Sequence, residues 1–475
     1  MWPFTRIGAR DTGTGVLWPM AWILYCVAST PAGEGGMERT IADESRTTGT
    51  DSPEVPTMAV GPAWWRALIP GPASTPGLML LCALLCRAVW LGLPSRALIF
   101  DEAYYVNAAR VIDGLPLPAG AQYAGQPAGR DPNREHPPLG KVLIAASIGA
   151  FGDGALGWRL PSLIAGIASI ALLYGIVRAA GGDPWLGVLA AALFAFDNLS
   201  LVHGRTGTLD MPLTAFLLLG GWCALRGRPL LAGMACALAA LVKLTGVYGL
   251  LALILFEAAE ATLAWDRTGR SYRPRTRPTL LLITGFVPVW FAGLWLLDAR
   301  WGVYRLPSDH LRYMLHYGFA LTRPSGPQGQ ESLPWQWLIN DVQMTYLRVD
   351  QQVMANGQLV TTRPLIYFRG AMNPLIIGSA PFGVSYTAWR AWHCQDRLAL
   401  WVLIWIAATY LPFYPLAMLG HRISYLYYFL PTLPAVTVAI ALFLRHGGLP
   451  RIVQWTYLAI VLVGFVGYFP FRAIP

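Results

Sequence analysis

The chain has 475 residues, of which 55% are hydrophobic and 13% are charged, and its mean hydropathy is +0.46. A soluble domain carries about 25% charged residues, so the composition excludes a soluble globular enzyme, a disordered chain and a nucleic-acid-binding protein. The net charge of +10 has to be interpreted by location, because Lys and Arg gather in the cytoplasmic loops of membrane proteins. The sequence therefore predicts an all-α polytopic membrane protein.

Residues 1–75 are expected to form an N-terminal tail. The apolar run at 16–28 is too short to span a bilayer comfortably and has the shape of a signal-peptide core. Residues 33–62 are rich in Gly, Ser, Thr and Pro, a composition typical of disorder. Met37 is an alternative start of translation, so residues 1–36 are either a signal segment or an annotation artefact.

Eleven apolar segments are predicted to span the membrane, at about 20 residues for each span. Two of them are short helices that turn at Lys243 to Gly246. The predicted spans are 76–94, 160–180, 185–202, 208–225, 229–243, 246–264, 279–297, 371–390, 398–418, 424–443 and 452–470.

The spans divide the rest of the chain into a transmembrane module at 76–297, with an outer loop at 95–159, a second outer loop at 298–370, and C-terminal helices at 371–475. Basic residues set the orientation, because cytoplasmic loops carry an excess of Lys and Arg. With the segment before the first span inside, the inner loops hold twelve Arg and three Asp. The Arg are at positions 178, 226, 228, 267, 270, 273, 275, 277, 390, 397, 445 and 451.

The first outer loop contains two acidic groups of interest. Asp101 and Glu102 follow the first span directly, and adjacent carboxylates at a membrane boundary are costly unless they are hydrated or used. They are candidates for a general base, with an ordinary interfacial acid pair as the alternative. Glu135 and His136 precede two prolines that hold the backbone extended, and residues 142–151 predict a short helix along the membrane surface.

Charged residues also cluster at the outer ends of several spans. Cations that converge at one depth would be satisfied by an anionic headgroup, most simply a phosphate. Snorkelling and structural ion pairs are the alternatives for single members. The cations are Arg159, Arg205, Lys243 and Arg422, and the acids near them are Asp197 and Asp210.

The second outer loop holds Trp335 within a Pro-Trp-Gln-Trp segment, interpreted either as a membrane-interface anchor or as a platform for sugar stacking. The sequence contains no Walker A motif, no HExxH motif and no DxD motif in an outer loop. The six cysteines mostly lie in apolar runs and are interpreted as buried hydrophobic residues. No metal site or cofactor is expected.

Several segments, taken in order, resemble the protein O-mannosyltransferase family. They are Phe100-Asp101-Glu102, His136-Pro137-Pro138-Leu139-Gly140-Lys141, Arg159-Leu160-Pro161-Ser162 and Phe196 to Asp210. Looser similarity is found at Pro334 to Trp337, Met372-Asn373-Pro374 and Arg422 to Pro431. The resemblance runs from about residue 80 to 475 and implies a GT-C-like bundle of about eleven transmembrane helices, whose two long outer loops carry interfacial helices.

The resemblance implies an inverting, metal-independent transfer of mannose from a polyprenyl (dolichyl-type) phosphate to Ser or Thr hydroxyls of translocated proteins. It maps the catalytic acids onto Asp101 and Glu102, with Asp101 as the base. Arg159, Arg205, Lys243 and Arg422 are assigned to the donor phosphate. Acceptor-side or site-shaping roles are assigned to Glu135, His136, Asp197, Asp210 and Trp335.

The implied setting is a bacterial plasma membrane, with the active site on the extracytoplasmic face. Membrane lipid and the protein secretion machinery are the further expected partners. The second outer loop, with about 70 residues, is too short for the β-trefoil domain of eukaryotic members. Glu135 stands where the family usually has Asp. Transfer of another sugar, such as aminoarabinose, to a lipid or glycan is an alternative, as is a transporter or flippase for an anionic substrate.

Overall fold

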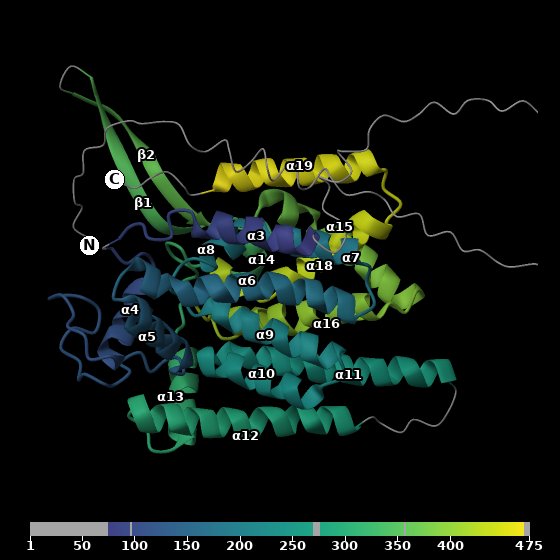
Figure 1. Ribbon diagram of the computed structural model, residues 1–475, viewed down its shortest axis with the longest axis horizontal. Coiled ribbons are helices and arrows are strands. Elements are labelled where there is room, and N and C mark those ends of the chain that lie inside the picture. The colour runs from purple at the N-terminus through teal and green to yellow at the C-terminus, as the bar shows by residue number, and fades with distance from the viewer. Residues whose placement is uncertain (1–74, 96, 269–275, 356–357, 470–475) are drawn as a thin grey trace, which may run out of the picture. The chain divides into compact units, whose positions relative to one another are not determined.

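The computed structural model describes residues 75–95, 97–268, 276–355 and 358–469. The predicted tail and most of the Arg-rich run at 267–277 lie outside these residues. Residues 8–79 belong to one compact unit and residues 80–475 to another, so the fold described below is that of the second unit. Helices dominate it (Figure 1).

The N-terminal half holds ten helices within the described residues. They are α3 (Thr75–Ala88), α4 (Glu102–Ile112), α5 (Leu139–Phe151), α6 (Ala155–Ala179), α7 (Pro184–Ala195), α8 (Asn198–His203), α9 (Asp210–Leu225), α10 (Pro229–Val242), α11 (Val247–Thr268) and α12 (Thr276–Trp301). A 3₁₀ turn, η1 (Leu244–Gly246), joins α10 to α11, at the turn predicted between two short helices.

The C-terminal half begins with α13 (Pro307–Ala320), α14 (Pro334–Trp337) and a hairpin of β1 (Met344–Ala355) and β2 (Gln358–Gly370). It continues with α15 (Pro374–His393), α16 (Arg397–Tyr410), α17 (Phe413–Met418), the 3₁₀ turn η2 (Leu426–Phe429), α18 (Leu433–His446) and α19 (Arg451–Tyr468).

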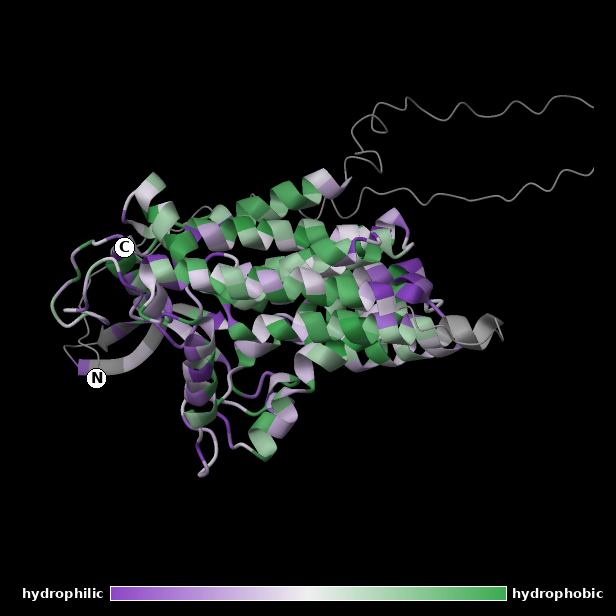
Figure 2. Cartoon of the chain, turned by 90° about the horizontal axis from the view of Figure 1, so that it is seen from below, coloured by the Kyte–Doolittle hydropathy of each residue, from purple (hydrophilic) through white to green (hydrophobic). Residues whose placement is uncertain are grey.

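Each of the eleven predicted spans overlaps a helix, although 185–202 is divided between α7 and α8, 398–418 is divided between α16 and α17, and 424–443 begins before α18. Five helical segments within the described residues are long and apolar enough to cross a membrane: Ala155–Ala179, Leu244–Thr262, Thr276–Trp301, Arg397–Met418 and Arg451–Tyr468. The other six predicted spans correspond to α3, α7, α9, α10, α15 and α18, of which all but α15 are apolar helices of 10–17 residues. Apolar residues cover the middle of the bundle, and polar residues gather at its two ends (Figure 2).

Close helix packing gives the bundle its core. Helix α10 packs against α9 and α12, α6 against α9 and α7, and α18 against α15 and α7. The contact between α10 and α12 depends on two glycines, because a Cβ at Gly233 would clash with the Leu282 carbonyl and one at Gly285 with that of Leu230. Small residues that let two backbones approach are the usual device of membrane helix pairs.

The two long loops reach the same end of the bundle, as the sequence predicted. Helices α4, α5 and α13 and the β1–β2 hairpin lie together there (Figure 1). The hairpin is antiparallel, from Met344 opposite Gly370 to Ala355 opposite Gln358, with three irregularities of register. It corrects the all-α prediction, because Thr, Val, Ile, Tyr and Phe are frequent in these two segments and favour strands.

The opposite end carries ion pairs made by the predicted inner-loop arginines. Arg390 binds Asp396 at 2.7 Å, Arg397 binds Glu260, and Arg445 binds Asp183 at 3.2 Å. Because these pairs join several inter-helix connections at one end, they support the predicted division of the loops between two faces. The buried interpretation of the cysteines holds for Cys82, Cys86, Cys223 and Cys236, and it is wrong for Cys394, which is exposed.

Candidate active site

Asp101 lies at the N-terminal end of α4, directly after a residue with an unusual backbone. Phe100 has a φ of 50°, the left-handed region that bulky residues rarely adopt. Its ring packs on Tyr346 of β1 and on Tyr427 of η2, with centroids 4.3 and 5.7 Å away. These contacts hold the turn into α4. Asp101 makes no side-chain cap bond to its own helix, so its carboxylate is left for other partners.

Those partners come from α9, α10 and η2. Burial is the main cause that raises the pKa of Asp101 to about 7, and the charge of Asp210 raises it further. The ammonium group of Lys243 and a hydrogen bond from Tyr427 act in the opposite direction. A carboxylate that titrates near neutral pH suits a general base, because it accepts a proton readily and is still ionised in part of the population.

Asp210 and Lys243 form a buried ion pair beside Asp101. Asp210 is the first residue of α9, Lys243 ends α10, and Lys243 Nζ lies 2.8 Å from Asp210 Oδ1. The ammonium group also lies over the rings of Tyr427 and Tyr428, at 5.3 and 5.0 Å. A small cavity adjoins the pair. Its lining residues are Asp210, Leu213, Leu217, Lys243, Thr245, Tyr248, Thr409, Phe413, Tyr428 and Pro431.

His136 approaches the same group from the first outer loop. Arg422 approaches it from the chain between α17 and η2. Burial, followed by the charges of Lys243, Lys141 and Arg422, holds the pKa of His136 well below its usual value. Its ring lies 6.0 Å from that of Tyr105. Arg422 has a buried Nη1 without a hydrogen-bond partner among the described residues. The structure therefore brings together Asp101, His136, Asp210, Lys243 and Arg422, as the sequence predicted.

Glu135 lies at the edge of this group. Its Oε1 accepts a hydrogen bond of 2.6 Å from Asn133, and burial raises its pKa. The longer side chain of Glu, compared with the Asp usual in the family, is thus held by a neighbour in its own loop.

His203 belongs to the site, although sequence reasoning assigned it no role. The ring is fully buried, with Nε2 2.5 Å from the Tyr346 hydroxyl, and Nδ1 3.2 Å from Thr208 Oγ1 and 3.8 Å from Asp210. The histidine lies at the end of an apolar helix, where a single polar residue gives little signal. Its main partner, Tyr346, belongs to the hairpin that was not predicted.

Glu102 and Arg159, predicted as a catalytic acid and a phosphate-binding cation, form an ion pair with each other. Both side chains are almost fully buried, and Arg159 donates to both carboxylate oxygens of Glu102, at 2.7 and 3.0 Å. Arg159 also donates to the carbonyls of Leu91 and Leu93, at 2.9 and 2.7 Å. In this structure the groups predicted for catalysis and for phosphate binding are thus engaged with each other, and their roles stay predictions.

Arg205 lies beside that pair and away from the other predicted cations. It is 4% exposed and interacts electrostatically with Arg159, Arg87 and Glu102. Arg87, which sequence reasoning overlooked, donates to the carbonyl of Ala195 and to Ser200, at 3.1 and 3.0 Å. The four predicted cations therefore form two groups, and only Lys243 and Arg422 lie near Asp101.

Two further predicted site residues lie elsewhere. Asp197 caps α8 through the amides of Leu199 and Ser200, and it accepts a bond of 2.7 Å from the Asn373 amide. These bonds satisfy its carboxylate and explain why an acid is buried there. Trp335 in α14 is 43% exposed, and its ring lies 6.1 Å from that of Tyr414. Neither residue lies among the groups around Asp101.

Among the residues that the structure describes, no three His, Cys, Asp or Glu side chains come close enough together to hold a metal ion. The charged groups brought together here are the carboxylates of Asp101 and Asp210 and the cations of Lys243 and Arg422. In chemical terms, this arrangement is able to accept a proton at one point and to offset negative charge at another.

Comparisons with known proteins agree with the sequence resemblance. The family model described as dolichyl-phosphate-mannose-protein mannosyltransferase matches residues 135–293. A polyprenol-phosphate-mannose–protein mannosyltransferase of Mycobacterium tuberculosis is 27% identical over 88% of this chain and 93% of its own length. The enzyme of the same name from Mycolicibacterium smegmatis is 24% identical over 82% and 87%.

The fold has a counterpart among solved structures. The S. cerevisiae protein O-mannosyltransferase Pmt1–Pmt2 complex bound to the sugar donor matches with a TM-score of 0.60 and 12% identity, over 84% of this chain and 91% of the matched chain. Between α12 and α15, the described residues form α13, α14 and a hairpin, so the second loop has no trefoil there. In sequence this chain is thus similar to polyprenol-phosphate-mannose–protein mannosyltransferases, and in fold to a protein O-mannosyltransferase.

Proposed function

We propose that this protein transfers mannose from a polyprenyl phosphate to Ser or Thr hydroxyls of acceptor proteins. The observation that carries the proposal is the placement of Asp101. Its carboxylate is buried, which raises its pKa to about 7, and it lies next to the Asp210–Lys243 pair. The neighbouring acid, Glu102, is instead paired with Arg159. The match to mannosyltransferases over most of the chain supports the choice of donor and acceptor class.

The reaction follows from this arrangement as a single in-line displacement. Asp101 accepts the proton of the acceptor hydroxyl while that oxygen attacks the anomeric carbon of mannose. The bond from this carbon to the phosphate oxygen breaks, and the polyprenyl phosphate leaves with its electron pair. One displacement inverts the anomeric configuration, so a donor of β configuration gives an α-linked product.

Lys243 and Arg422 are the cations proposed to offset the charge of the leaving phosphate. Lys243 already lies against a carboxylate and two aromatic rings, so its position is fixed before the donor arrives. Preorganised charge of this kind stabilises a developing anion without reorganisation. The largely apolar cavity next to Lys243 offers a surface for the first part of the lipid chain. We propose that the reaction needs no metal or cofactor, so activity is expected to survive excess EDTA.

The site is proposed to face the extracytoplasmic side of a bacterial plasma membrane. Asp101 directly precedes α4, and α4 lies at the end of the bundle where the two long loops meet (Figure 1). The Arg-containing connections, with Arg390, Arg397 and Arg445, lie at the other end, and basic loops face the cytoplasm. An acceptor would then meet the enzyme during or after secretion, and the secretion machinery and membrane lipid are its proposed neighbours.

The test uses purified protein in lipid nanodiscs with labelled polyprenyl-phosphate mannose and a Ser/Thr-rich peptide. Transfer of label to the peptide that is lost in Asp101→Asn supports the donor, the acceptor and the base. Asp309→Asn is the matched control, because Asp309 is exposed in α13. Label that reaches only a lipid, or that is transferred only from a donor carrying another sugar, contradicts the proposal. Alkali-induced β-elimination of the labelled peptide checks that the new bond is to a Ser or Thr oxygen.

A further inference from the structure

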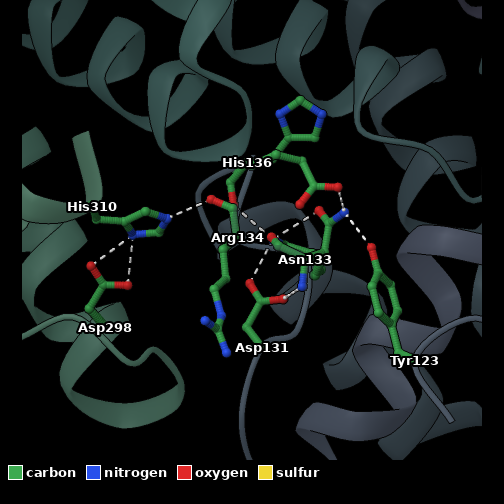
Figure 3. Close-up of polar contacts among 9 residues, drawn as sticks. Tyr123, Asp131, Asn133, Arg134, His136, Asp298 and His310 are labelled. Atoms are coloured by element: carbon green, nitrogen blue, oxygen red, sulfur yellow. Dashed lines mark hydrogen bonds and ion pairs between the residues drawn. The ribbon is translucent and has the colours of Figure 1, made fainter. Parts of the chain in front are cut away.

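A second buried polar cluster joins the two outer loops, outside the groups around Asp101. It lies where the segment before α5 meets the end of α12 and the start of α13 (Figure 3). Asp298 in α12 and His310 in α13 are 3% and 2% exposed. His310 Nδ1 lies 3.0 and 2.9 Å from the two oxygens of Asp298, and Nε2 lies 2.9 Å from the carbonyl oxygen of Arg134.

Both ring nitrogens of His310 therefore face acceptors. A carboxylate and a carbonyl have no hydrogen to give, so the two contacts are both hydrogen bonds only when each nitrogen carries a hydrogen. The ring thus bridges the carboxylate of Asp298 in α12 and the backbone of the first outer loop. Tyr304 stacks on the ring at 4.6 Å, with 19° between the planes, and holds its orientation.

The segment that receives this bond has no regular backbone partner. Residues 133–136 precede Pro137 and Pro138, which have no amide hydrogen, and buried carbonyls need donors from elsewhere. Lys141 supplies them to the carbonyls of Asn133 and His136, the latter at 2.8 Å, and it pairs with Asp131 at 2.6 Å. His310 supplies the donor to the carbonyl between them.

Other contacts reinforce the joint between the two loops. The Asp131 amide donates to the Trp301 carbonyl at 2.7 Å, and Arg130 donates to the carbonyl of Gly302. The ring of His136 extends to the opposite side of the backbone from this cluster (Figure 3), towards Lys243 and Arg422, whose charges act on it. The backbone at Arg134 thus links the cluster on one side to the candidate site on the other.

We propose that His310, held by Asp298, is a positioning residue that fixes Glu135 and His136 on the acceptor side of the site. It acts through the carbonyl of Arg134 and touches no substrate. The inference rests on the proposed function. It means that a residue of the second outer loop affects the active site without touching a substrate. Loss of the bond frees the segment at Arg134, while the Asp210–Lys243 pair that faces the donor remains in place.

The test compares His310→Phe, which keeps a ring for Tyr304 but removes both donors, with the milder His310→Gln, which keeps one donor. His316→Gln is the matched control, because His316 lies on the exposed side of the same helix. We expect kcat/KM for the peptide to fall about 10- to 100-fold in His310→Phe, since small misplacements near the reacting groups are costly. The peptide KM should rise, the donor KM should stay within about twofold, and His310→Gln should recover part of the loss.

A merely structural role gives a different result. If His310 only stabilises the fold, kcat falls with the amount of folded protein and the peptide KM does not change, which overturns the proposal. Unchanged kinetics in His310→Phe also overturn it. Hydrogen exchange gives a readout independent of activity: peptides covering 131–141 should exchange faster in His310→Phe, while those from α9 and α10 stay protected. If wild-type protein transfers no mannose, the proposed function fails, and hydrogen exchange alone decides whether His310 holds this segment.

Discussion

Asp101 and Glu102 are adjacent acids, and we expect their neutral variants to fail in opposite ways. Glu102 receives four donated hydrogen bonds: two from Arg159, at 2.7 and 3.0 Å, and one each from the amides of Ile99 and Gly207, both at 2.9 Å. In Glu102→Gln, one of the two carboxylate oxygens becomes an amide nitrogen that cannot accept these bonds. Arg159 also keeps its charge without a counter-charge.

Breaking a buried ion pair at one partner costs about 3–5 kcal/mol, and no solvent reaches this pair to reduce that cost, because Glu102 is 0% exposed and Arg159 1% exposed. Asp101 makes no cap bond, so Asp101→Asn should leave the free energy of unfolding unchanged or slightly raised. Its transfer rate should fall about 10²- to 10⁴-fold, the usual contribution of a general base.

Thermal unfolding in detergent, followed by tryptophan fluorescence, measures the stability of both variants, and single-turnover transfer of labelled mannose measures the rate. The expected result is a stable, inactive Asp101→Asn and a clearly destabilised Glu102→Gln whose folded fraction retains activity. The reasoning is refuted if Glu102→Gln is as stable as wild type but inactive, or if Asp101→Asn transfers mannose at the wild-type rate.

Further predictions concern the groups around Asp101 and the exposed Trp335, which lies apart from them. Asp101 must be ionised to accept a proton, so activity should rise as the pH passes through about 7, the pKa of Asp101. Asp210→Asn removes a charge that raises this pKa, so the acid limb of the pH–kcat/KM profile should move to lower pH; an unmoved limb would exclude the coupling. Arg422→Gln should weaken binding of polyprenyl phosphate by about 2–5 kcal/mol, and equal affinity in a titration would contradict its phosphate role. Trp335→Ala should keep activity within about twofold, and a large rise in KM for either substrate would restore the sugar-stacking interpretation.

Helix positions were predictable because hydrophobic runs of membrane length are a strong signal. All eleven predicted spans overlap helices, including the pair that turns at Lys243. The hairpin was missed, although Asn356-Gly357 is a common turn pair between strands. Its strands lie in a loop interpreted only by its aromatic and basic residues, and alternation over a few residues is weak beside the hydropathy of the spans.

The proximity of candidate site residues could be predicted where an acid or a base stands at the end of a helix. Asp101, Asp210 and Lys243 satisfy that condition, and the structure brings them together. Asp197 also stands at the end of a helix, but its partners are backbone amides, including that of Asn373, 176 positions away in the chain. No pattern in the sequence distinguishes a carboxylate that binds backbone amides from one that is left for chemistry.

The same difficulty explains why the four predicted cations form two groups. A buried cation near the membrane surface needs negative charge, and the sequence does not show which acid reaches which cation. Glu102 binds Arg159 through both oxygens, which accept hydrogen bonds from Nε and Nη2 of the guanidinium group. Asp210 satisfies Lys243 only at Oδ1, and its Oδ2 accepts no hydrogen bond from the described residues. Arg422 has a buried nitrogen, Nη1, that likewise has no hydrogen-bond partner among the described residues. Unsatisfied buried polar atoms are costly in a finished fold, so these two atoms near Asp101 are consistent with the proposal that a charged substrate binds there.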